Sequence, residues 1–139
     1  MINTGNVQIR IIHSAGIAEI VNLYKSAGGW EESYNAEAFI PPMVKNSACF
    51  VGAFDDGRMI GMGRAVSDNV SDAYIQDIVV LDEYRGHGIG GEIIKLLIRE
   101  LKAKGVDWIG LIGEPGTEKF YSRLGFSTLK GFIPMKLTE

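Results

Sequence analysis

A run of glycines directly after a strongly apolar segment is the part of the sequence whose residue types point most clearly to a ligand. The run reads Arg85-Gly86-His87-Gly88-Ile89-Gly90-Gly91. Glycines at alternate positions leave backbone N–H groups without neighbouring Cβ atoms, so several of these donors can converge on an anion. Arg85 adds a full positive charge, and a helix beginning here adds unpaired N–H groups. The run is therefore predicted to bind a phosphate or pyrophosphate.

The segments on either side of the glycine run predict a strand before it and a helix after it. Residues 73–80 are rich in β-branched and aromatic types and contain no glycine or proline, which favours a strand. Its apolar residues occur on both faces, as in a strand at the centre of a sheet. After the run, apolar residues recur with helical spacing at Ile93, Ile94, Leu97, Ile98 and Leu101.

The residue order excludes one kind of phosphate loop and disfavours another. A P-loop needs Gly-Lys followed by Ser or Thr, which is absent after the glycines. The spacing Gly86-x-Gly88-x-x-Gly91 satisfies the dinucleotide-binding pattern, and Glu114 follows the next strand, where a ribose-binding acid is expected. A dinucleotide fold needs several further strand–helix–strand units, however, and only 25 residues follow Glu114. A dinucleotide-binding oxidoreductase is therefore the less favoured alternative.

The same run resembles the pyrophosphate loop of the GNAT superfamily of N-acetyltransferases. The family pattern is Gln/Arg-x-x-Gly-x-Gly/Ala, which Arg85, Gly88 and Gly90 match. A later segment, Phe120-Tyr121-Ser122-Arg123-Leu124-Gly125-Phe126, also fits the family, and the resemblance covers nearly the whole chain. It implies an enzyme that moves an acetyl group from acetyl-CoA directly to a primary amine of a small molecule, through a ternary complex. A module that binds acyl-CoA without catalysis is the other alternative.

For acetyl-CoA, the resemblance implies contacts from the glycine run, from the end of the central strand and from the segment before Tyr121. In the family, a bulge separates the central strand from its parallel neighbour and opens a slot for the pantetheine arm. Many members carry an asparagine shortly before the tyrosine; this chain has none there, so Thr117 and Lys119 are the candidates in that segment. The residues expected to contact acetyl-CoA are Ile78, Val79, Val80, Arg85, Gly86, His87, Gly88, Ile89, Gly90, Gly91, Thr117 and Lys119.

Transfer to an amine needs a base and an acid. An alkylammonium has a pKa of about 10, so a carboxylate must remove its proton directly or through a water molecule. Asp77 and Glu114 lie at or near strand ends facing the expected slot, and both stay candidates for the base. The leaving thiolate needs a proton, and Tyr121 matches the family's tyrosine in this role. Histidine is a residue type that often serves as a general base, but the position of His87 among the glycines favours contact with phosphate.

The acceptor amine is expected to contact Trp30, Tyr34 and Gln76. The two aromatic residues lie in an irregular segment after the first helix, where mobile connections often wall a substrate pocket. Alternatively, Trp30 and Tyr34 cover the edge of the hydrophobic core and contact no substrate. Strand alternation places Gln76 on the opposite face from Asp77, so that Gln76 lines the acceptor side if Asp77 packs beneath the helices. Acidic residues expected near the acceptor favour a small cationic amine. They are Glu31, Glu32, Glu37, Asp68 and Asp72.

The composition fits one domain and excludes several classes of function. The 139 residues are 46% hydrophobic and 22% charged, so residues 1–139 are expected to form a single globular domain. The net charge of -3 gives no basic surface for nucleic acid. No apolar run approaches the ~20 residues of a membrane span. The single cysteine, Cys49, excludes an internal disulfide and a thiolate metal cluster; we expect no metal and a cytoplasmic location. Among protein partners, the sequence leaves a homodimer open.

Periodicity along the chain predicts an α/β (α+β) fold with a mixed, mostly antiparallel sheet of about seven strands and about four helices. The expected order is β-α-α-β-β-β-α-β-α-β-β, which the GNAT resemblance also implies. The best hairpin signal is Asp55-Asp56-Gly57 between apolar runs. Residues 126–129 and 132–137 are expected to form a closing strand pair.

Two helices are expected between the first strand and this hairpin. Ser14 can cap the first and Asn35 the second. Pro41 and Pro42 disrupt a helix interior, so the second helix is expected either to end near Phe39 or to begin at the prolines.

Overall fold

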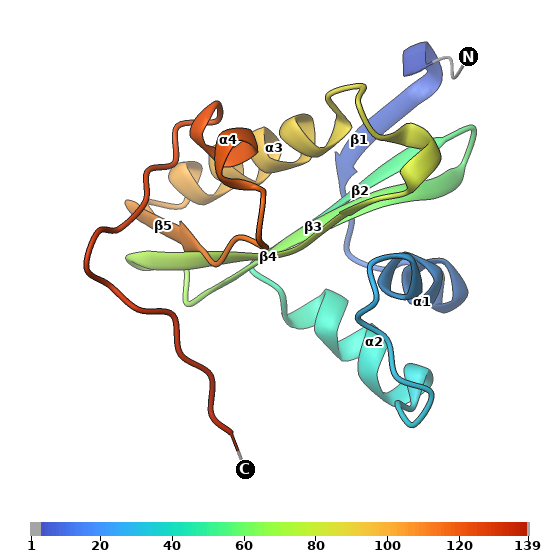
Figure 1. Ribbon diagram of the computed structural model, residues 1–139. Helices are drawn as coiled ribbons and strands as arrows, with labels where there is room; N and C mark the ends of the chain where they lie inside the picture. Colours follow the sequence, from blue (N-terminus) through green and yellow to red (C-terminus); the bar gives the residue numbers. More distant parts are fainter. Residues whose placement is uncertain (1–3, 139) are drawn as a thin grey trace.

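The computed structural model describes residues 4–138, and its elements follow the predicted order as far as the last helix (Figure 1). The strands are β1 (Val7–Ile11), β2 (Cys49–Asp55), β3 (Arg58–Ser67), β4 (Asp72–Val80) and β5 (Trp108–Leu111). The helices are α1 (Ile17–Ser26), α2 (Ala36–Asn46), α3 (Ile89–Ala103) and α4 (Glu118–Ser122), with short 3-10 turns η1 (Thr4–Asn6) and η2 (Asp82–Tyr84). The mixed α/β class is confirmed, with five strands in the described part rather than about seven.

The five strands form one sheet in which spatial order equals chain order. Neighbours from β1 to β4 are antiparallel, whereas β4 and β5 are parallel, as predicted. Helices α3 and α4 lie on one face of the sheet, and α1 and α2 lie on the other (Figure 1). A sheet with one parallel pair is not the doubly wound sheet that binds dinucleotides, so the fold argues against the oxidoreductase alternative.

The β2–β3 hairpin closes through the predicted turn. Asp56 and Gly57 have φ angles of 50° and 83°, and a two-residue type I′ turn requires positive values at both positions. Asp55 pairs with Arg58 across the turn.

Helix α1 begins later than predicted, because a contact with the sheet determines its start. The N-cap is Gly16 rather than Ser14, and no side chain caps the helix. Glu19, in the first turn, instead accepts a hydrogen bond of 2.7 Å from the backbone N–H of Met59 in β3. This contact ties the start of α1 to the sheet.

Helix α2 continues through Pro41 and Pro42, so both predicted limits are wrong. The predicted cap is present, since the Asn35 side chain accepts a backbone hydrogen bond of 3.3 Å. The prolines remove two N–H donors, but they lie on the exposed side of the helix, while Ile40 and Val44 are buried on the other. Packing of the apolar side therefore outweighs the lost hydrogen bonds.

Helix α3 packs closely on the sheet because β3 carries a glycine beneath it. A Cβ at Gly63 would lie 2.5 Å from Ile78 Cδ1 and 2.7 Å from Ile93 Cγ2, so a larger residue would displace the helix. The buried residues of α3 are Ile89, Ile93, Ile94, Leu97 and Leu101. Each contributes about 1.5–3 kcal/mol by leaving water. This packing fixes where α3 begins and therefore where the glycine run lies.

The closing strand pair predicted for residues 126–129 and 132–137 is wrong. These residues form no strand with any other described residue, and beyond Phe126 they are exposed. After α4 the chain passes the edge strand β5 and runs away from the body of the protein (Figure 1). The apolar residues that predicted strands are present, but a strand also needs a partner edge, which this path does not meet.

Cys49 is buried in the core, and burial raises the pKa of its thiol, as expected for a packing residue. Within residues 4–138, no helix is both long and apolar enough to cross a bilayer. The same residues contain no cluster of three or more His, Cys, Asp or Glu arranged for a metal ion.

Candidate active site

The glycine run forms the turn that leads into α3. Gly86 and Gly88 both have a φ of 81°, a conformation that residues with a Cβ rarely adopt. A Cβ added at either position would meet no atom within 4 Å, so the space beside the turn is open. Gly88 is the N-cap of α3, and no side chain caps the helix. Uncapped N–H groups beside open space fit a pyrophosphate, as predicted for this run.

Contacts around η2 hold the glycine run in position. Tyr84 is buried, and its hydroxyl donates a short hydrogen bond to the Asp55 carboxylate at the end of β2. Arg85 Nε donates to the Val80 carbonyl at 3.1 Å, and the guanidinium pairs with Asp82 at 2.9 Å. Arg85 thus ties the end of β4 to the turn, while its exposed side chain stays within reach of an anion.

Strand β4 separates from β5 partway along its length. The two strands pair only as far as Ile75 and Leu111, and β4 then continues to Val80 without a partner on that side. On the side that faces away from β3, the main chain of Ile78, Val79 and Val80 therefore pairs with no strand of the described structure, although the Val80 carbonyl accepts the hydrogen bond from Arg85. This is the stretch in which the family resemblance implies a slot for pantetheine.

A β-bulge in the same stretch changes which side chains face α1 and α2. Asp77 has a φ of 58°, and the β3–β4 register shifts between the pairs Met62–Val79 and Arg64–Gln76. Regular alternation would place Gln76 and Asp77 on opposite faces. The extra residue instead turns both toward the α1/α2 face, where Arg64 contacts both side chains. The prediction that they face opposite sides is wrong because it assumed a regular strand.

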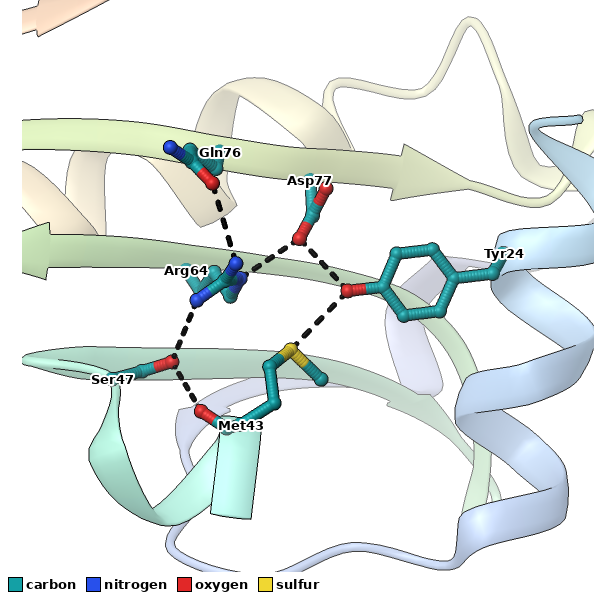
Figure 2. Close-up of polar contacts among 6 residues, drawn as sticks. All are labelled: Tyr24, Met43, Ser47, Arg64, Gln76 and Asp77. Carbon is teal, nitrogen blue, oxygen red and sulfur yellow. Dashed lines mark hydrogen bonds and ion pairs between the residues drawn. The ribbon is translucent and has the colours of Figure 1, made fainter. Parts of the chain in front are cut away.

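Arg64 and Tyr24 hold the Asp77 carboxylate between the sheet and α1 (Figure 2). Arg64 Nε and the Tyr24 hydroxyl each donate to Asp77 Oδ2 at 2.8 Å. Arg64 also donates to Gln76 Oε1 at 3.2 Å and to Ser47 Oγ at 3.4 Å. The side chains of Arg64 and Asp77 are only 18% and 29% exposed, so solvent screens this ion pair weakly. Burial, reinforced by the charge of Asp77, raises the pKa of Tyr24 and keeps it a hydrogen-bond donor.

An aromatic cluster, defined by Tyr24, Trp30, Tyr34 and Phe39, adjoins this network. The centroid of the Trp30 ring lies 6.1 Å from that of Tyr24, 5.1 Å from that of Tyr34 and 6.0 Å from that of Phe39. Tyr34 and Phe39 are exposed, whereas Trp30 is half-buried. Because Tyr24 belongs to both groups, the two aromatics expected at the acceptor side are linked to Asp77.

Tyr121 lies in α4, after β5. Its ring packs against Phe120 and Phe126, with centroids 4.9 Å and 5.9 Å away. Its hydroxyl donates no hydrogen bond to another described residue. Burial, followed by the negative charge of Glu114, raises the pKa of Tyr121. The phenol therefore stays protonated at neutral pH and can act as an acid.

The two motifs singled out in the sequence meet at the start of α3. A Cβ at Gly90 would lie 3.3 Å from Phe120 Cζ and 3.8 Å from Val80 Cγ2. A Cβ at Gly91 would lie 3.6 Å from Leu124 Cδ2. The segment that contains Tyr121 therefore packs directly against the glycine run and the end of β4.

The other predicted site residues have few contacts. Glu114 is exposed, and its carboxylate has no hydrogen-bond partner in the described part of the chain. The Thr117 hydroxyl donates to the Glu114 carbonyl at 2.6 Å, so its first role is to close that turn. The His87 and Lys119 side chains are exposed and form no hydrogen bond or ion pair with another candidate residue among residues 4–138.

Two residues of the network, Tyr24 and Arg64, were missed by the sequence analysis. Tyr24 lies at helical spacing from Ile17, Ile20 and Val21, so the sequence pattern does not distinguish it from a packing residue. Arg64 is the one charge between positions 59 and 66 of an apolar run, and a charge there needs a partner because unpaired burial is costly. That signal could have found Arg64, although not its partner.

Two surface hollows of the described structure lie away from the candidate site. One is lined by residues of β1 and α3, and another by residues around β1 and the β2–β3 turn. Neither contains a predicted site residue.

The sequence matches the model of the acetyltransferase (GNAT) family over residues 17–126. Among curated proteins, an uncharacterised N-acetyltransferase from Prochlorococcus marinus is 29% identical over 120 residues, 84% of this chain and 65% of the relative. A chloroplastic serotonin N-acetyltransferase from Oryza sativa is 38% identical over 71 residues, 51% of this chain and 36% of the relative. This chain spans between 40% and 65% of the length of the first three curated relatives.

Solved structures of similar fold have nearly the same length. A GNAT family acetyltransferase from Streptococcus pneumoniae has a TM-score of 0.82 and 23% sequence identity, and the match covers 96% of this chain and 98% of that one. At this identity the likeness shows the fold.

Proposed function

Because the chain belongs to the GNAT family of acetyltransferases, we propose that it transfers an acetyl group from acetyl-CoA to a primary amine of a small molecule. The observation that carries the proposal is the meeting of the two motifs, with the glycine run at the start of α3 packed against the Phe120–Tyr121 segment. Cys49, the only thiol in the sequence, is buried in the core, which supports direct transfer in a ternary complex rather than an acylated enzyme.

The residues around the glycine run fit the diphosphate of acetyl-CoA. Backbone N–H groups of residues 86–91 would hold its phosphates, with the exposed Arg85, His87 and Lys119 supplying further donors. The main chain of residues 78–80, which pairs with no strand on the β5 side, would hold the pantetheine arm, together with Thr117. When bound, acetyl-CoA supplies an activated thioester.

Tyr121 is the proposed general acid. Its raised pKa leaves the phenol protonated, and its hydroxyl has no competing partner among the described residues, so it can give its proton to the departing thiolate. The role of the ring contacts with Phe120 and Phe126 is to fix the direction of the phenol.

Glu114 is our preferred base, acting directly or through water. Its carboxylate is exposed and unpaired in the described structure, and it lies close enough to Tyr121 to raise the pKa of that phenol. Asp77 is the second candidate. Its Oδ2 already accepts hydrogen bonds from Arg64 and Tyr24, which makes it better suited to positioning the acceptor than to taking a proton.

The acceptor is proposed to bind on the α1/α2 face. The exposed rings of Tyr34 and Phe39, with Trp30 and the nearby polar group of Gln76, suit an amine with an aromatic or aliphatic body. The name of the Oryza sativa relative, an acetyltransferase of an arylalkylamine, supports testing that class first. Exposed acids near this segment, including Glu31 and Glu37, favour a cationic substrate.

Three further parts of the proposal stay predictions. Residues 1–139 are proposed to be one acetyltransferase domain, which the near-complete coverage of compact solved structures supports. A cytoplasmic location rests on the single cysteine alone. A homodimer also stays a prediction.

A panel of amines tests the proposed reaction. Purified protein is incubated with acetyl-CoA and one amine at a time, and release of the CoA thiol is followed, with arylalkylamines, polyamines, aminosugars, amino acids and a lysine peptide as acceptors. We expect release with at least one small primary amine, well above hydrolysis without acceptor. Binding of acetyl-CoA without release in any reaction would indicate the non-catalytic module, and release only with the peptide would contradict a small-molecule acceptor.

A further inference from the structure

The β4 bulge contains the one residue other than glycine that has a positive φ within a strand of the described structure. Asp77 has a φ of 58°, whereas the other two such residues, Asp56 and Asn69, lie between strands. This left-handed conformation is unfavourable for a residue with a Cβ, although aspartate tolerates it better than most. Residues 73–80 contain no glycine that would favour a bulge. The reason for the bulge therefore lies in the contacts of its side chains.

Without the bulge, the Asp77 carboxylate would lie among apolar side chains. In a regular strand Asp77 would share a face with Ile75, two residues before it, which is buried on the α3 side of the sheet. On this face, a Cβ at Gly63 would lie 2.5 Å from Ile78 Cδ1 and 2.7 Å from Ile93 Cγ2, so apolar side chains fill the space beside the bulge. An unpaired carboxylate buried among them would be costly.

The bulge instead turns Asp77 toward Arg64 on the α1/α2 face (Figure 2). Arg64 Nε donates to Asp77 Oδ2 at 2.8 Å, and the two side chains are 18% and 29% exposed. In every other ion pair of residues 4–138, both side chains are more than half exposed. Further hydrogen bonds to Ser47 and Gln76 hold the guanidinium in place. Solvent therefore screens the Arg64–Asp77 pair least, and the pair forms only when the strand is bulged.

The bulge lies where the proposed slot for acetyl-CoA begins. Pairing of β4 with β5 ends at Ile75, and after the bulge β4 stays paired with β3 through Val79 and Val80. An extra residue in a strand changes the direction of the peptide groups that follow it. The bulge therefore determines how the main chain of residues 78–80 is directed toward the side that β5 leaves open.

We propose that the Arg64–Asp77 ion pair holds the bulge and thereby directs the backbone groups of residues 78–80 at the thioester of acetyl-CoA. Asp77 is then a positioning residue, not the base, and Arg64 positions the same groups through it. An ion pair that is satisfied in only one arrangement of a strand selects that arrangement over its alternatives. As an amine adds to a thioester, the carbonyl oxygen gains negative charge, which fixed donors stabilise. The effect on turnover rests on the proposed acetyl transfer, whereas the hold on the bulge does not.

Glycine at position 77 separates the bulge from the carboxylate, because glycine adopts a positive φ without steric cost and alanine does not. We expect kcat, with acetyl-CoA and the best amine of the panel both saturating, to fall at least ~10-fold in Asp77→Ala and less than about threefold in Asp77→Gly. Asp77→Asn tolerates the same conformation and keeps an oxygen for Arg64, so it should resemble Asp77→Gly. Equal losses in all three variants would mean that the carboxylate itself acts in catalysis, and would overturn the proposal, as would full activity of Asp77→Ala.

Removing Arg64 tests the other half of the pair. Arg64→Met keeps an apolar side chain without the charge, and in the original chain it should lower kcat at least ~10-fold. Added to Asp77→Gly, it should lower kcat less than about threefold further, because glycine holds the bulge without the ion pair. Arg58→Met, at an exposed arginine of the same strand, is the control that should keep kcat. Equal losses from Arg64→Met in both backgrounds would assign Arg64 a contact with substrate and contradict the proposal.

The β3–β4 register provides a readout that needs no activity. Backbone NMR contacts should show the pairs Met62–Val79 and Arg64–Gln76 together in the original chain and in Asp77→Gly, but not in Asp77→Ala or Arg64→Met. Urea denaturation checks that each variant is folded. An unchanged register in Asp77→Ala and Arg64→Met overturns the hold on the bulge, whatever happens to activity. A register that changes as expected in a protein that acetylates no amine supports this hold and overturns only the proposed function.

Discussion

The acetyl-CoA side and the acceptor side of the site are built from different parts of the chain. On the proposed acetyl-CoA side, the groups open to a ligand are backbone N–H groups of contiguous residues at the start of α3, kept accessible by glycine. On the second, side chains from α1, β3, β4 and the segment before α2 converge through Arg64, Asp77 and Tyr24. Backbone recognition by a contiguous segment leaves a motif in the sequence. Convergence of distant side chains leaves isolated residues whose roles appear only after folding.

The largest effect should come from Gly88→Val, which tests the proposed acetyl-CoA side, where backbone N–H groups would bind the ligand. Valine is strained at a φ of 81°, and its branches would occupy the open space beside the turn. We expect acetyl-CoA affinity measured by calorimetry to fall at least ~100-fold, which corresponds to about 2.7 kcal/mol of binding free energy.

Gly105→Val is the matched control for strain. Gly105 follows α3, has a φ of 90° and also has no atom within 4 Å of an added Cβ. It should lose similar stability but keep its acetyl-CoA affinity. Equal loss of affinity in both variants would mean that backbone strain, not occupied phosphate space, causes the effect.

Tyr121→Phe should have the next largest effect and should act on turnover alone. Removing the hydroxyl removes the proposed acid while keeping the ring contacts with Phe120 and Phe126, so kcat should fall about 100-fold. Acetyl-CoA affinity should change less than twofold. Tyr74→Phe, at an exposed tyrosine outside the site, should leave kcat unchanged. Full activity of Tyr121→Phe would exclude the phenol as the acid.

Glu114→Gln should lower kcat/KM for the amine about tenfold at neutral pH, a loss typical of the smaller contributions of a general base. The loss should shrink as pH rises toward the amine's own pKa of about 10, because the neutral amine then needs no base. Steady-state kinetics between neutral and alkaline pH measure this. Glu118→Gln, an exposed acid in α4, is the control and should keep the original profile. A loss that is constant with pH would assign Glu114 a role other than proton removal.

The smallest effect is expected from Tyr24→Phe, which tests the proposed acceptor side, where side chains from distant parts of the chain converge. The ring contact with Trp30 is kept, but the hydrogen bond to Asp77 is lost, at a cost of about 1 kcal/mol in the free energy of unfolding. Urea denaturation should detect this loss. KM for the amine should rise about two- to fivefold, whereas acetyl-CoA affinity should not change. A change confined to acetyl-CoA would place this network on the other side of the site.

Sequence reasoning succeeded where short-range rules apply. The Asp56-Gly57 turn and the Asn35 cap follow from backbone preferences of single residues and their neighbours. The helix predicted after the glycine run is also present, although it begins at Ile89, within the run, rather than after Gly91. The parallel β4–β5 pair follows from the handedness of a crossover helix. These rules involve few alternatives, so the sequence alone suffices.

It failed where the outcome depends on a partner distant in the chain. Alternation placed Asp77 on the opposite face from Gln76, because it did not foresee that Asp77 adopts the left-handed conformation and shifts the alternation of the strand by one residue. The apolar residues between positions 127 and 137 were interpreted as strands, although in the described structure they pair with no strand.

By itself, therefore, the sequence determined the glycine run, the strand and helix that flank it, the second motif around Tyr121 and the family that these imply. Only the tertiary structure decided that Arg64 and Tyr24 hold Asp77, that Trp30 and Tyr34 belong to one aromatic cluster with Tyr24, and that residues 127–138 form no strand with the sheet. The physical reason is the separation along the chain of the residues that interact. Backbone conformation depends on a few adjacent residues, whereas the pairing of a buried charge or a strand edge depends on whatever the rest of the chain places beside it.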